Sequence, residues 1–398
     1  MISEVINIQQ PQTAVNFSWT STQTDFKNNI IAFAKEHLND GIVDRDQNLK
    51  FSRELWKKCA EFGIQGLSVP QKYGGKFEDI DLLTATLAME GLGYGSKDNG
   101  LPFALNAQMW TVQLPLYEFG TEAQREKYLR PMVSGDLIGA HGLTEPDAGS
   151  DVFSMKTHAK KVEGGYILNG QKRLITFGPE ADIALVFANV NPKIGKWGVT
   201  GFIVEKGTKG FIQGANNSKM GLRTVPIGDL FFEDCFIPTE NRLGKEGSGW
   251  AITSYSLEYD RCSILASQLG AMERQLEESI AFVKQREQFG KPINTFQSVS
   301  NRIADMKLRL ETSRLLLYKV AWLKNEGDSA MLDAALLKLQ LSESFITSSM
   351  DAIRNHGGSG FLTEHGVERN LRDAIGGVLY AGTSDIQRNI ISQLLFSK

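Results

Sequence analysis

Four short segments of the 398-residue sequence gather glycine, hydroxyl-bearing and small residues. Glycine lets a backbone approach a planar or phosphate-bearing ligand closely, and free N–H groups at turns and helix starts bind anions. Each segment alone could be a turn or a helix cap, but the four together are a more specific signal of such a ligand. The segments are HGLTEPDAGSD at residues 141–151, RLITFG at 173–178, RNHGGSGF at 354–361 and AGTSDIQ at 381–387.

Several other chemistries lack the residues they need. The sequence has no G-x-x-x-x-G-K-[ST] phosphate loop, no strand-linked G-x-G-x-x-G followed by an acidic residue, and no G-x-S-x-G elbow. Its five histidines show no paired i,i+4 spacing. Cys59, Cys235 and Cys262 are scattered without metal or disulfide spacing, which favours a reducing, cytoplasmic location and predicts no metal site.

Composition narrows the class further. A formal net charge of −3 with no basic tract argues against nucleic acid as the main partner, because phosphate neutralisation needs clustered cations. Hydrophobic residues at 41% and charged residues at 22% are ordinary for a globular protein. No window approaches the roughly 20 consecutive apolar residues of a membrane helix, so no membrane span is expected.

The elements that must position the four segments fall into blocks. Residues 1–16 are expected to be a loose tail, and 17–136 a helical domain, because apolar residues recur every three to four positions. Residues 137–245 contain alternating runs such as GVTGFIVEK, which predict an all-β barrel or sandwich with a turn at Asn169-Gly170. Residues 246–398 return to long helical periodicity, typical of a bundle.

Together the motifs resemble those of the acyl-CoA dehydrogenase family of flavoproteins. The resemblance runs from about residue 25 to the end and rests on TEPDAGSD, ITFG, REQFGKPI, HGGSGF and GTSDIQ. It implies an α+β multi-domain fold with an N-terminal helical domain, a middle β-barrel and a C-terminal four-helix bundle. It also implies a homotetramer that binds FAD between the β domain, the bundle and a neighbouring subunit.

Matching positions assign roles to individual residues. The resemblance places the flavin ring against Leu143, Thr144, Gly149, Ser150, Ile175 and Thr176. It places the pyrophosphate and adenosine, across a subunit interface, against Arg286, Gln288, Phe289 and Phe296. It places a partner-subunit contact at Arg354 and Gly358, and the diphosphate at Thr383 and Asp385. Substrate contacts are expected from Ser150, Glu258, Arg261, Tyr380, Ala381 and Gly382.

Two positions depart from the family pattern around the flavin. Leu174 stands where the family often has a tryptophan that covers the ring, and His141 stands where a flavin-loop tyrosine is frequent. Shielding and redox tuning of the flavin are therefore expected to differ. Reaction of the reduced enzyme with oxygen is expected to be easier than in strict dehydrogenases.

The implied reaction is α,β-dehydrogenation of an acyl thioester, in which a carboxylate removes the α-proton while a hydride leaves the β-carbon for flavin N5. The family often places this base just before the G-T-S turn, where this chain has Ala381. Branches similar to isovaleryl-CoA dehydrogenase place the base instead on the first long helix of the bundle, before an arginine. The matching residue in SYSLEYDRCSILA is Asp260, before Arg261.

Helix geometry separates Asp260 from the runner-up, Glu258. Residues two apart point about 200° away from each other, so both cannot face one pocket. Asp260 lies beside Leu257 and Ile264, a partly apolar surface that predicts a raised pKa. Glu258 is expected to form an ordinary surface pair with Arg261, or to touch the pantetheine arm. The stripe expected to be buried is Ile252, Tyr255, Tyr259, Cys262, Ala266 and Leu269.

The substrate and partners stay open at this point. Residues 96–110, SKDNGLPFALNAQMW, are similar to the branch acting on acyl or aminoacyl groups, such as prolyl, of a carrier protein, although CoA shares the same arm. The electron acceptor is expected to be an electron-transfer flavoprotein or oxygen. Alternatives are a flavin oxidase or monooxygenase on the same fold, and a non-catalytic flavoprotein that has lost its base.

Overall fold

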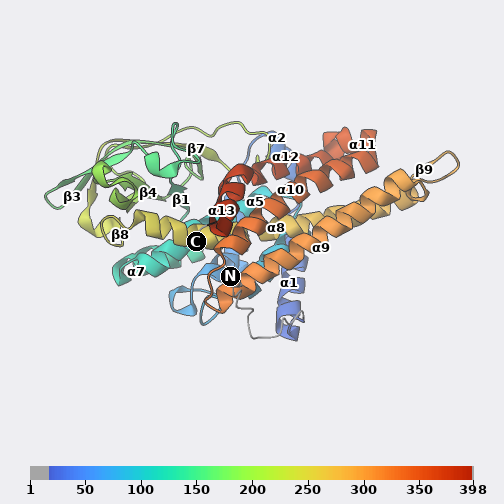
Figure 1. The fold of residues 1–398 in the computed structure, drawn as a ribbon, viewed down its shortest axis with the longest axis horizontal. Coiled ribbons are helices and arrows are strands. Elements are labelled where there is room, and N and C mark those ends of the chain that lie inside the picture. Colours follow the sequence, from blue (N-terminus) through green and yellow to red (C-terminus); the bar gives the residue numbers. More distant parts are fainter. Residues whose placement is uncertain (1–17, 397–398) are drawn as a thin grey trace, which may run out of the picture.

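The computed structural model describes residues 18–396, and the tail expected at 1–16 lies outside them. The order is helical, β, helical, as the periodicity predicted. The β domain occupies one end of an elongated molecule, and the hairpin between α8 and α9 reaches the other end (Figure 1). Within the described residues, no helix combines the length and apolar character needed to cross a membrane.

The N-terminal helices form the first layer. α1 begins with a capping box in which Thr20 and Gln23 satisfy each other's backbone N–H groups, and α7 begins with the same device at Thr121 and Gln124. A π-helical turn at Met109–Gln113 joins α5 to α6. The helices are α1 (Ser21–His37), α2 (Ile42–Gln47), α3 (Arg53–Phe62), α4 (Leu82–Gly95), α5 (Gly100–Gln108), α6 (Leu114–Phe119) and α7 (Glu122–Val133).

The middle domain is one eight-stranded sheet in the order β6-β7-β3-β2-β4-β5-β8, with β1 parallel to β4. Among the described strands, β6 and β8 do not pair with each other, so the ladder of the expected barrel stays open. The strands are β1 (Gly139–Gly142), β2 (His158–Val162), β3 (Gly165–Thr176), β4 (Ile183–Asn189), β5 (Val199–Glu205), β6 (Phe211–Gln213), β7 (Ile227–Pro238) and β8 (Arg242–Leu243).

The turn predicted at Asn169-Gly170 is wrong. Both residues lie inside β3, where its register with β7 shifts, and the Asn169 amide exchanges hydrogen bonds with Asp234. A Cβ on Gly170 would overlap Thr157, so this glycine permits a close approach. The hairpin from β2 to β3 turns instead at Gly164, which has a φ of 76°.

The C-terminal helices form the bundle. α8 is 37 residues long and packs against α4, α9 and α10. The elements are α8 (Gly249–Gln285), β9 (Glu287–Gln288), β10 (Lys291–Pro292), α9 (Gln297–Asn325), α10 (Met331–His356), α11 (Gly358–Phe361), α12 (Val367–Gly377) and α13 (Ser384–Phe396).

Two glycines bring α4 and α8 into backbone contact. A Cβ on Gly93 would overlap the carbonyl oxygen of Ser267, and a Cβ on Gly270 would overlap that of Glu90. We expect Gly93→Ala to destabilise the protein by about 3 kcal/mol, because a backbone carbonyl cannot step aside as a side chain can. The measurement is the urea midpoint of the holoprotein.

Gly91→Ala is the matched control for this crossing. Its new Cβ would lie 3.0 Å from Lys27 Cγ and 3.1 Å from the Lys27 carbonyl oxygen, tight contacts but far longer than the 1.9 Å at Gly93, and alanine has a helix propensity about 1 kcal/mol better than glycine. An unchanged midpoint in Gly93→Ala would contradict the tight crossing.

Candidate active site

Asp260 lies on α8 with 3% of its surface exposed. Burial raises the pKa of its carboxyl to about 7, although the charges of Arg261 and Lys338 lower it. Within the described residues, its Oδ1 atom is buried without a hydrogen-bond partner. The raised pKa predicted from Leu257 and Ile264 is confirmed, and a base poised near neutral pH suits general-base catalysis.

The buried surface of α8 is wider than the predicted stripe. Ile252, Cys262, Ala266 and Leu269 are fully buried as expected, whereas Tyr255 and Tyr259 are half-buried. From Cys262 to Met272 every residue of α8 is buried. This part of α8 is therefore surrounded by other elements on all sides, and Asp260 lies just before the fully buried stretch begins.

Lys338 is a neighbour of Asp260 that the sequence analysis missed. It lies on α10, fully buried, and its Nζ donates to the carbonyl oxygen of Gly377. Burial lowers its pKa to about 8, the Arg261 charge adds to this, and the Asp260 charge opposes it. Its position at helical spacing among Ala334, Leu341 and Phe345 was the available signal, because a lysine rarely occupies an apolar stripe.

The turn before α13 lies against this carboxyl. Arg261 Nε donates to the carbonyl oxygen of Ala381 at 3.5 Å, and Gln387 Nε2 donates to the same oxygen at 3.1 Å. Ala381 has a φ of 53°, in the left-handed region, and Gly382 follows at 89°. The position where the family often has its base is thus adjacent to the helix that carries Asp260. Gln387, fully buried, is a second residue the sequence analysis left without a role.

Tyr380 lies beside the same group of residues around Asp260. Its hydroxyl accepts a hydrogen bond from Gln268 Nε2, and its ring lies 4.8 Å from that of Phe103. Burial raises the pKa of the Tyr380 phenol, and the nearby Asp260 charge adds to this, so it stays protonated. The free oxygen of Gln268 is buried without a partner in the described part of the chain.

The pairing predicted for Glu258 is wrong. Its Oε1 lies 3.4 Å from Lys324 Nζ and accepts a hydrogen bond from the backbone N–H of Ala330 at 2.7 Å. The connection between α9 and α10 folds over this face of α8, while Arg261 turns towards Ala381. Lys324 and Ala330 therefore hold Glu258 on a different face of α8 from Asp260.

The flavin-side residues form a second group, in the β domain. Arg173 N donates to the carbonyl oxygen of Thr144 at 2.8 Å, which holds the loop after β1 against the end of β3 near Thr176. Lys172 is fully buried, and its Nζ donates to the carbonyl oxygen of Leu143 at 3.0 Å and to Glu145 at 2.7 Å. This buried ion pair fixes the loop before Gly149 and Ser150, which are exposed.

Leu174 and His141, the two residues that depart from the family pattern, occupy different environments. Leu174 has a φ of 59° and is 55% exposed, so its side chain stands outside the sheet. His141 is half-buried with its ring 5.3 Å from that of Phe187, and loss of solvation lowers the pKa of its imidazole to about 4, with the Lys172 charge adding to this. His141 is therefore neutral at physiological pH.

The third group lies at the far tip of the bundle. Phe289 is 93% exposed, and Arg286 and Gln288 beside it are also exposed. Arg354 and Gly358 lie at the end of α10 nearby, where the ring of Phe282 stacks on His356 at 4.3 Å. At 1.5 Å per residue, Arg286 lies about 40 Å along α8 from Asp260. One chain therefore does not bring this group together with the other two.

Thr383 and Asp385 stand at the start of α13. The Thr383 hydroxyl accepts from the backbone N–H of Ile386 at 3.2 Å, and Asp385 pairs with Arg388 at 3.2 Å. Ser384 is 8% exposed, and its hydroxyl has no partner within the described residues. The helix start thus presents backbone N–H groups and an unpaired hydroxyl, which suits an anion. No group of metal-ligating side chains occurs within residues 18–396.

Removal of the Lys338 charge should be visible in a pH profile. In Lys338→Met, the Asp260 carboxyl loses a nearby cation, so the pKa of this carboxyl rises. The rate of flavin reduction then reaches its plateau only at a higher pH. We expect an upward move of the profile by about one unit. Lys324→Met, on the Glu258 face, should leave the profile in place, and equal profiles for both variants would contradict the assignment.

Known proteins match this chain over its length. The N-terminal, middle and C-terminal domains of acyl-CoA dehydrogenases match residues 20–136, 140–235 and 247–396. The L-prolyl-[peptidyl-carrier protein] dehydrogenase of Serratia sp. (strain ATCC 39006) is 41% identical, over 96% of this chain and 98% of that protein. The crystal structure of the prolyl acyl carrier protein oxidase AnaB has a TM-score of 0.93 and 46% identity, covering 95% of this chain and 100% of that one. PigA with FAD and proline has a TM-score of 0.93 and 41% identity, covering 96% and 99%.

Proposed function

The chain belongs to the acyl-CoA dehydrogenase family, and from this premise we propose that its substrate is an aminoacyl thioester, of the prolyl type, on a peptidyl carrier protein. It is an FAD-dependent oxidoreductase that acts on a CH–CH group of a thioester. The observation that carries the catalytic part of the proposal is the buried Asp260 carboxyl, which lies on α8 beside the turn of Ala381.

Asp260 is the proposed base that takes the α-proton of the substrate. A carboxylate with a pKa of about 7 is largely ionised above neutral pH and basic enough to accept a proton from an activated carbon. Lys338 and Arg261 are positioning residues, because their positive charges lower the pKa of the buried Asp260 carboxyl and keep it ionisable. Glu258 is held by Lys324 and Ala330 and is left with a role in binding.

The residues present fit FAD. The start of α13, with the unpaired Ser384 hydroxyl and Thr383, suits the diphosphate, and Gly382 leaves room for a close approach. The loop of Leu143 and Thr144, held against β3 at Thr176, suits the flavin ring. When bound, FAD supplies the acceptor for the hydride of the β-carbon.

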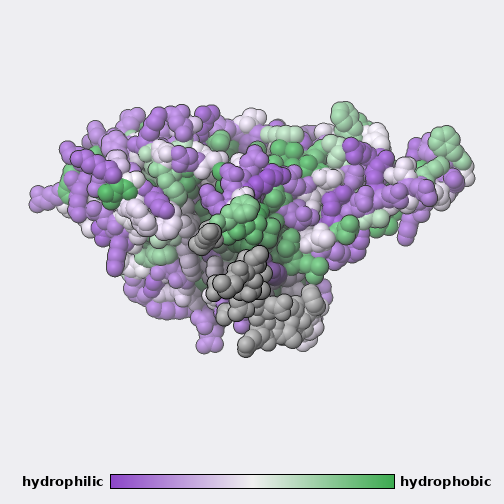
Figure 2. Space-filling model, viewed as in Figure 1, coloured by the Kyte–Doolittle hydropathy of each residue, from purple (hydrophilic) through white to green (hydrophobic). Residues whose placement is uncertain are grey.

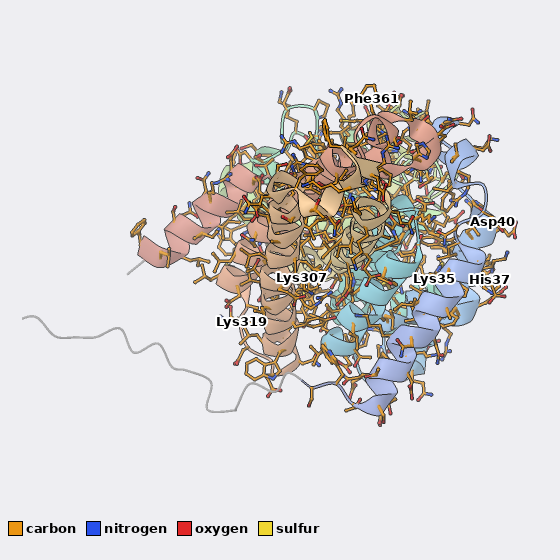
Figure 3. All side chains as sticks on the ribbon, turned by 90° about the vertical axis from the view of Figure 1, so that its right-hand side faces the viewer. Lys35, His37, Asp40, Lys307, Lys319 and Phe361 are labelled. Atoms are coloured by element: carbon orange, nitrogen blue, oxygen red, sulfur yellow. The ribbon has the colours of Figure 1, made fainter. Side chains whose placement is uncertain are left out.

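A neighbouring chain is needed to complete this site. Arg286, Gln288 and Phe289 lie about 40 Å along α8 from the Asp260 of their own chain, beyond the reach of one cofactor. Phe289 is 93% exposed, and Phe361 nearby is 81% exposed. Hydrophobic residues reach the surface at this end of the molecule (Figure 2), and Phe361 lies at the outer edge when the molecule is viewed from that side (Figure 3). We assign these side chains to the FAD of a second subunit within a homotetramer, as the motifs imply.

An aminoacyl substrate suits the buried polar groups of the site. Asp260 Oδ1 and Gln268 Oε1 are both buried acceptors without partners among the described residues. An amine on the substrate would donate to Asp260 Oδ1, whereas a hydrocarbon chain would leave this acceptor unpaired at a penalty of about 1–3 kcal/mol. The buried free cysteines Cys59, Cys235 and Cys262 support a reducing, cytoplasmic setting for this reaction.

Oxygen is a second candidate for the electron acceptor, beside an electron-transfer flavoprotein. The side chain of Leu174 stands exposed where the family often covers the flavin with a tryptophan, and AnaB is described as an oxidase. Rapid reoxidation of the reduced enzyme in air would favour the oxidase, and slow reoxidation would favour a protein acceptor.

Anaerobic bleaching of the bound flavin tests the proposed function. The panel pairs prolyl, other aminoacyl and short acyl thioesters, each on CoA and on a carrier protein. Bleaching by prolyl carrier protein in preference to all CoA esters is the expected result. Bleaching by CoA esters alone would mean that the substrate is an acyl-CoA and not a carrier-bound aminoacyl group. A flavin that no thioester bleaches would favour the non-catalytic alternative.

A further inference from the structure

A basic and apolar loop joins β4 to β5. Residues Pro192–Gly198 form two short 3₁₀ turns separated by a kink at Gly195, and they expose Lys193 and Lys196, with Ile194 51% exposed and Trp197 55% exposed. The loop contains no acidic residue, and neither lysine forms a salt bridge with any described residue. Exposed apolar side chains beside cations that form no salt bridge are typical of a surface that contacts another molecule.

The loop is held in shape rather than left free. Val190 N donates to Gly198 O at 2.9 Å across its ends, and the Asn191 side chain accepts from Lys193 N at 3.3 Å. The Trp197 ring lies 4.9 Å from that of Trp250, and Lys196 Nζ lies 4.2 Å from the Trp250 ring centroid. We call Lys193, Ile194, Lys196, Trp197 and Trp250 the Lys–Trp patch.

The Lys–Trp patch adjoins the proposed active site along two routes. Trp250 lies in the first turn of α8, and Asp260 follows ten residues later, about 15 Å along the helix. The loop also packs against the turn Val152–Ser154, which follows the predicted substrate contact Ser150. A thioester arm that entered beside this patch would run along α8 towards Asp260.

We propose that the Lys–Trp patch docks the carrier protein that delivers the substrate, by contact with an acidic face that has an apolar centre. The proposal rests on the proposed function, since a carrier substrate is what requires a protein-sized docking surface. The two exposed lysines favour negative charge on the partner. The exposure of Ile194 and Trp197 favours a protein over the nucleotide of CoA, which could use the lysines but offers nothing apolar to Ile194.

The test compares one prolyl group on three supports: the carrier protein, CoA and free pantetheine. In the double variant Lys193→Glu with Lys196→Glu, and separately in Trp197→Ala, we expect kcat/KM for prolyl carrier protein to fall by about tenfold or more. Turnover of prolyl pantetheine should stay at the wild-type value. The matched control is Lys206→Glu with Lys209→Glu, two exposed lysines at the opposite end of β5, which should change nothing.

Each other outcome overturns the docking surface in a recognisable way. A loss confined to the CoA ester would make the patch a nucleotide site, and an equal loss on all three supports would make it part of the catalytic structure. A changed elution volume in gel filtration would make it a contact between copies of this chain. Failure of wild-type enzyme on every thioester would end the proposed function instead. In that case a fluorescence titration of Trp197 with prolyl carrier protein decides the docking alone, since absent or variant-independent binding overturns it.

Discussion

Asp260→Asn should slow anaerobic flavin reduction by about 10²–10⁴-fold while the protein keeps its FAD. The amide has nearly the shape of the carboxyl but cannot accept the α-proton, and general-base catalysis is typically worth about 10²–10⁴ in rate. The rate of the wild type should rise with pH through about 7, where the carboxyl ionises, and this rise should vanish from the residual rate of the variant. Stopped-flow absorbance of the flavin gives both quantities.

Two neighbouring substitutions make this result specific. Glu258→Gln removes the other carboxylate of this part of α8 and should change KM more than the reduction rate, because Glu258 is engaged with Lys324. Asp260→Glu keeps a base one methylene longer and should retain measurable reduction with the same pH rise. A full rate in Asp260→Asn, or a thousandfold loss in Glu258→Gln, would reverse the assignment.

Two inactive variants should restore activity when they are expressed together. On the proposed assignment, Asp260→Asn disables the chemistry of its own chain, whereas Arg286→Glu disables an FAD contact that the proposal gives to a neighbouring chain. In a mixed pair, one site has an intact Asp260 and receives an intact Arg286, so a one-to-one mixture should show roughly a quarter of wild-type activity. The measurement is turnover of the purified mixture, compared with each variant alone.

The control for this complementation combines two variants whose substituted residues are both assigned to the FAD of their own subunit. Asp260→Asn mixed with Thr176→Arg should remain inactive, because both side chains serve the FAD of their own subunit. Recovery in this control, or no recovery with Arg286→Glu, would mean that the tip of α8 does not complete a neighbouring site.

The sequence predicted what depends on local pattern and on motifs. The order of helical and β blocks followed from apolar periodicity, and Asp260 followed from its place before Arg261 together with an apolar helix face. Lys338 was out of reach because its role depends on which helix α10 packs against, although its position in an apolar stripe was visible. Tertiary packing, rather than helical spacing, decides the partner of such a residue.

The two wrong predictions fail for the same physical reason. Spacing of three residues suggested that Glu258 pairs with Arg261, but the Glu258 carboxylate instead contacts Lys324, at the end of α9, and the backbone N–H of Ala330. Asn169-Gly170 has a turn composition, but both residues lie inside β3, where Gly170 packs against Thr157, just before β2, and Asn169 bonds to Asp234 on β7. In each case a partner distant in sequence outcompeted the local alternative.

The exposed tip of α8 has a consequence for how the cofactor is retained. If each FAD is held partly by Phe289 and Arg286 of a second chain, then cofactor affinity and chain association are linked by mass action. Dilution would release FAD, and added FAD would draw chains together. A newly made chain would then bind FAD only weakly before it associates with another chain. The cellular concentration of the protein would therefore set the fraction that carries FAD.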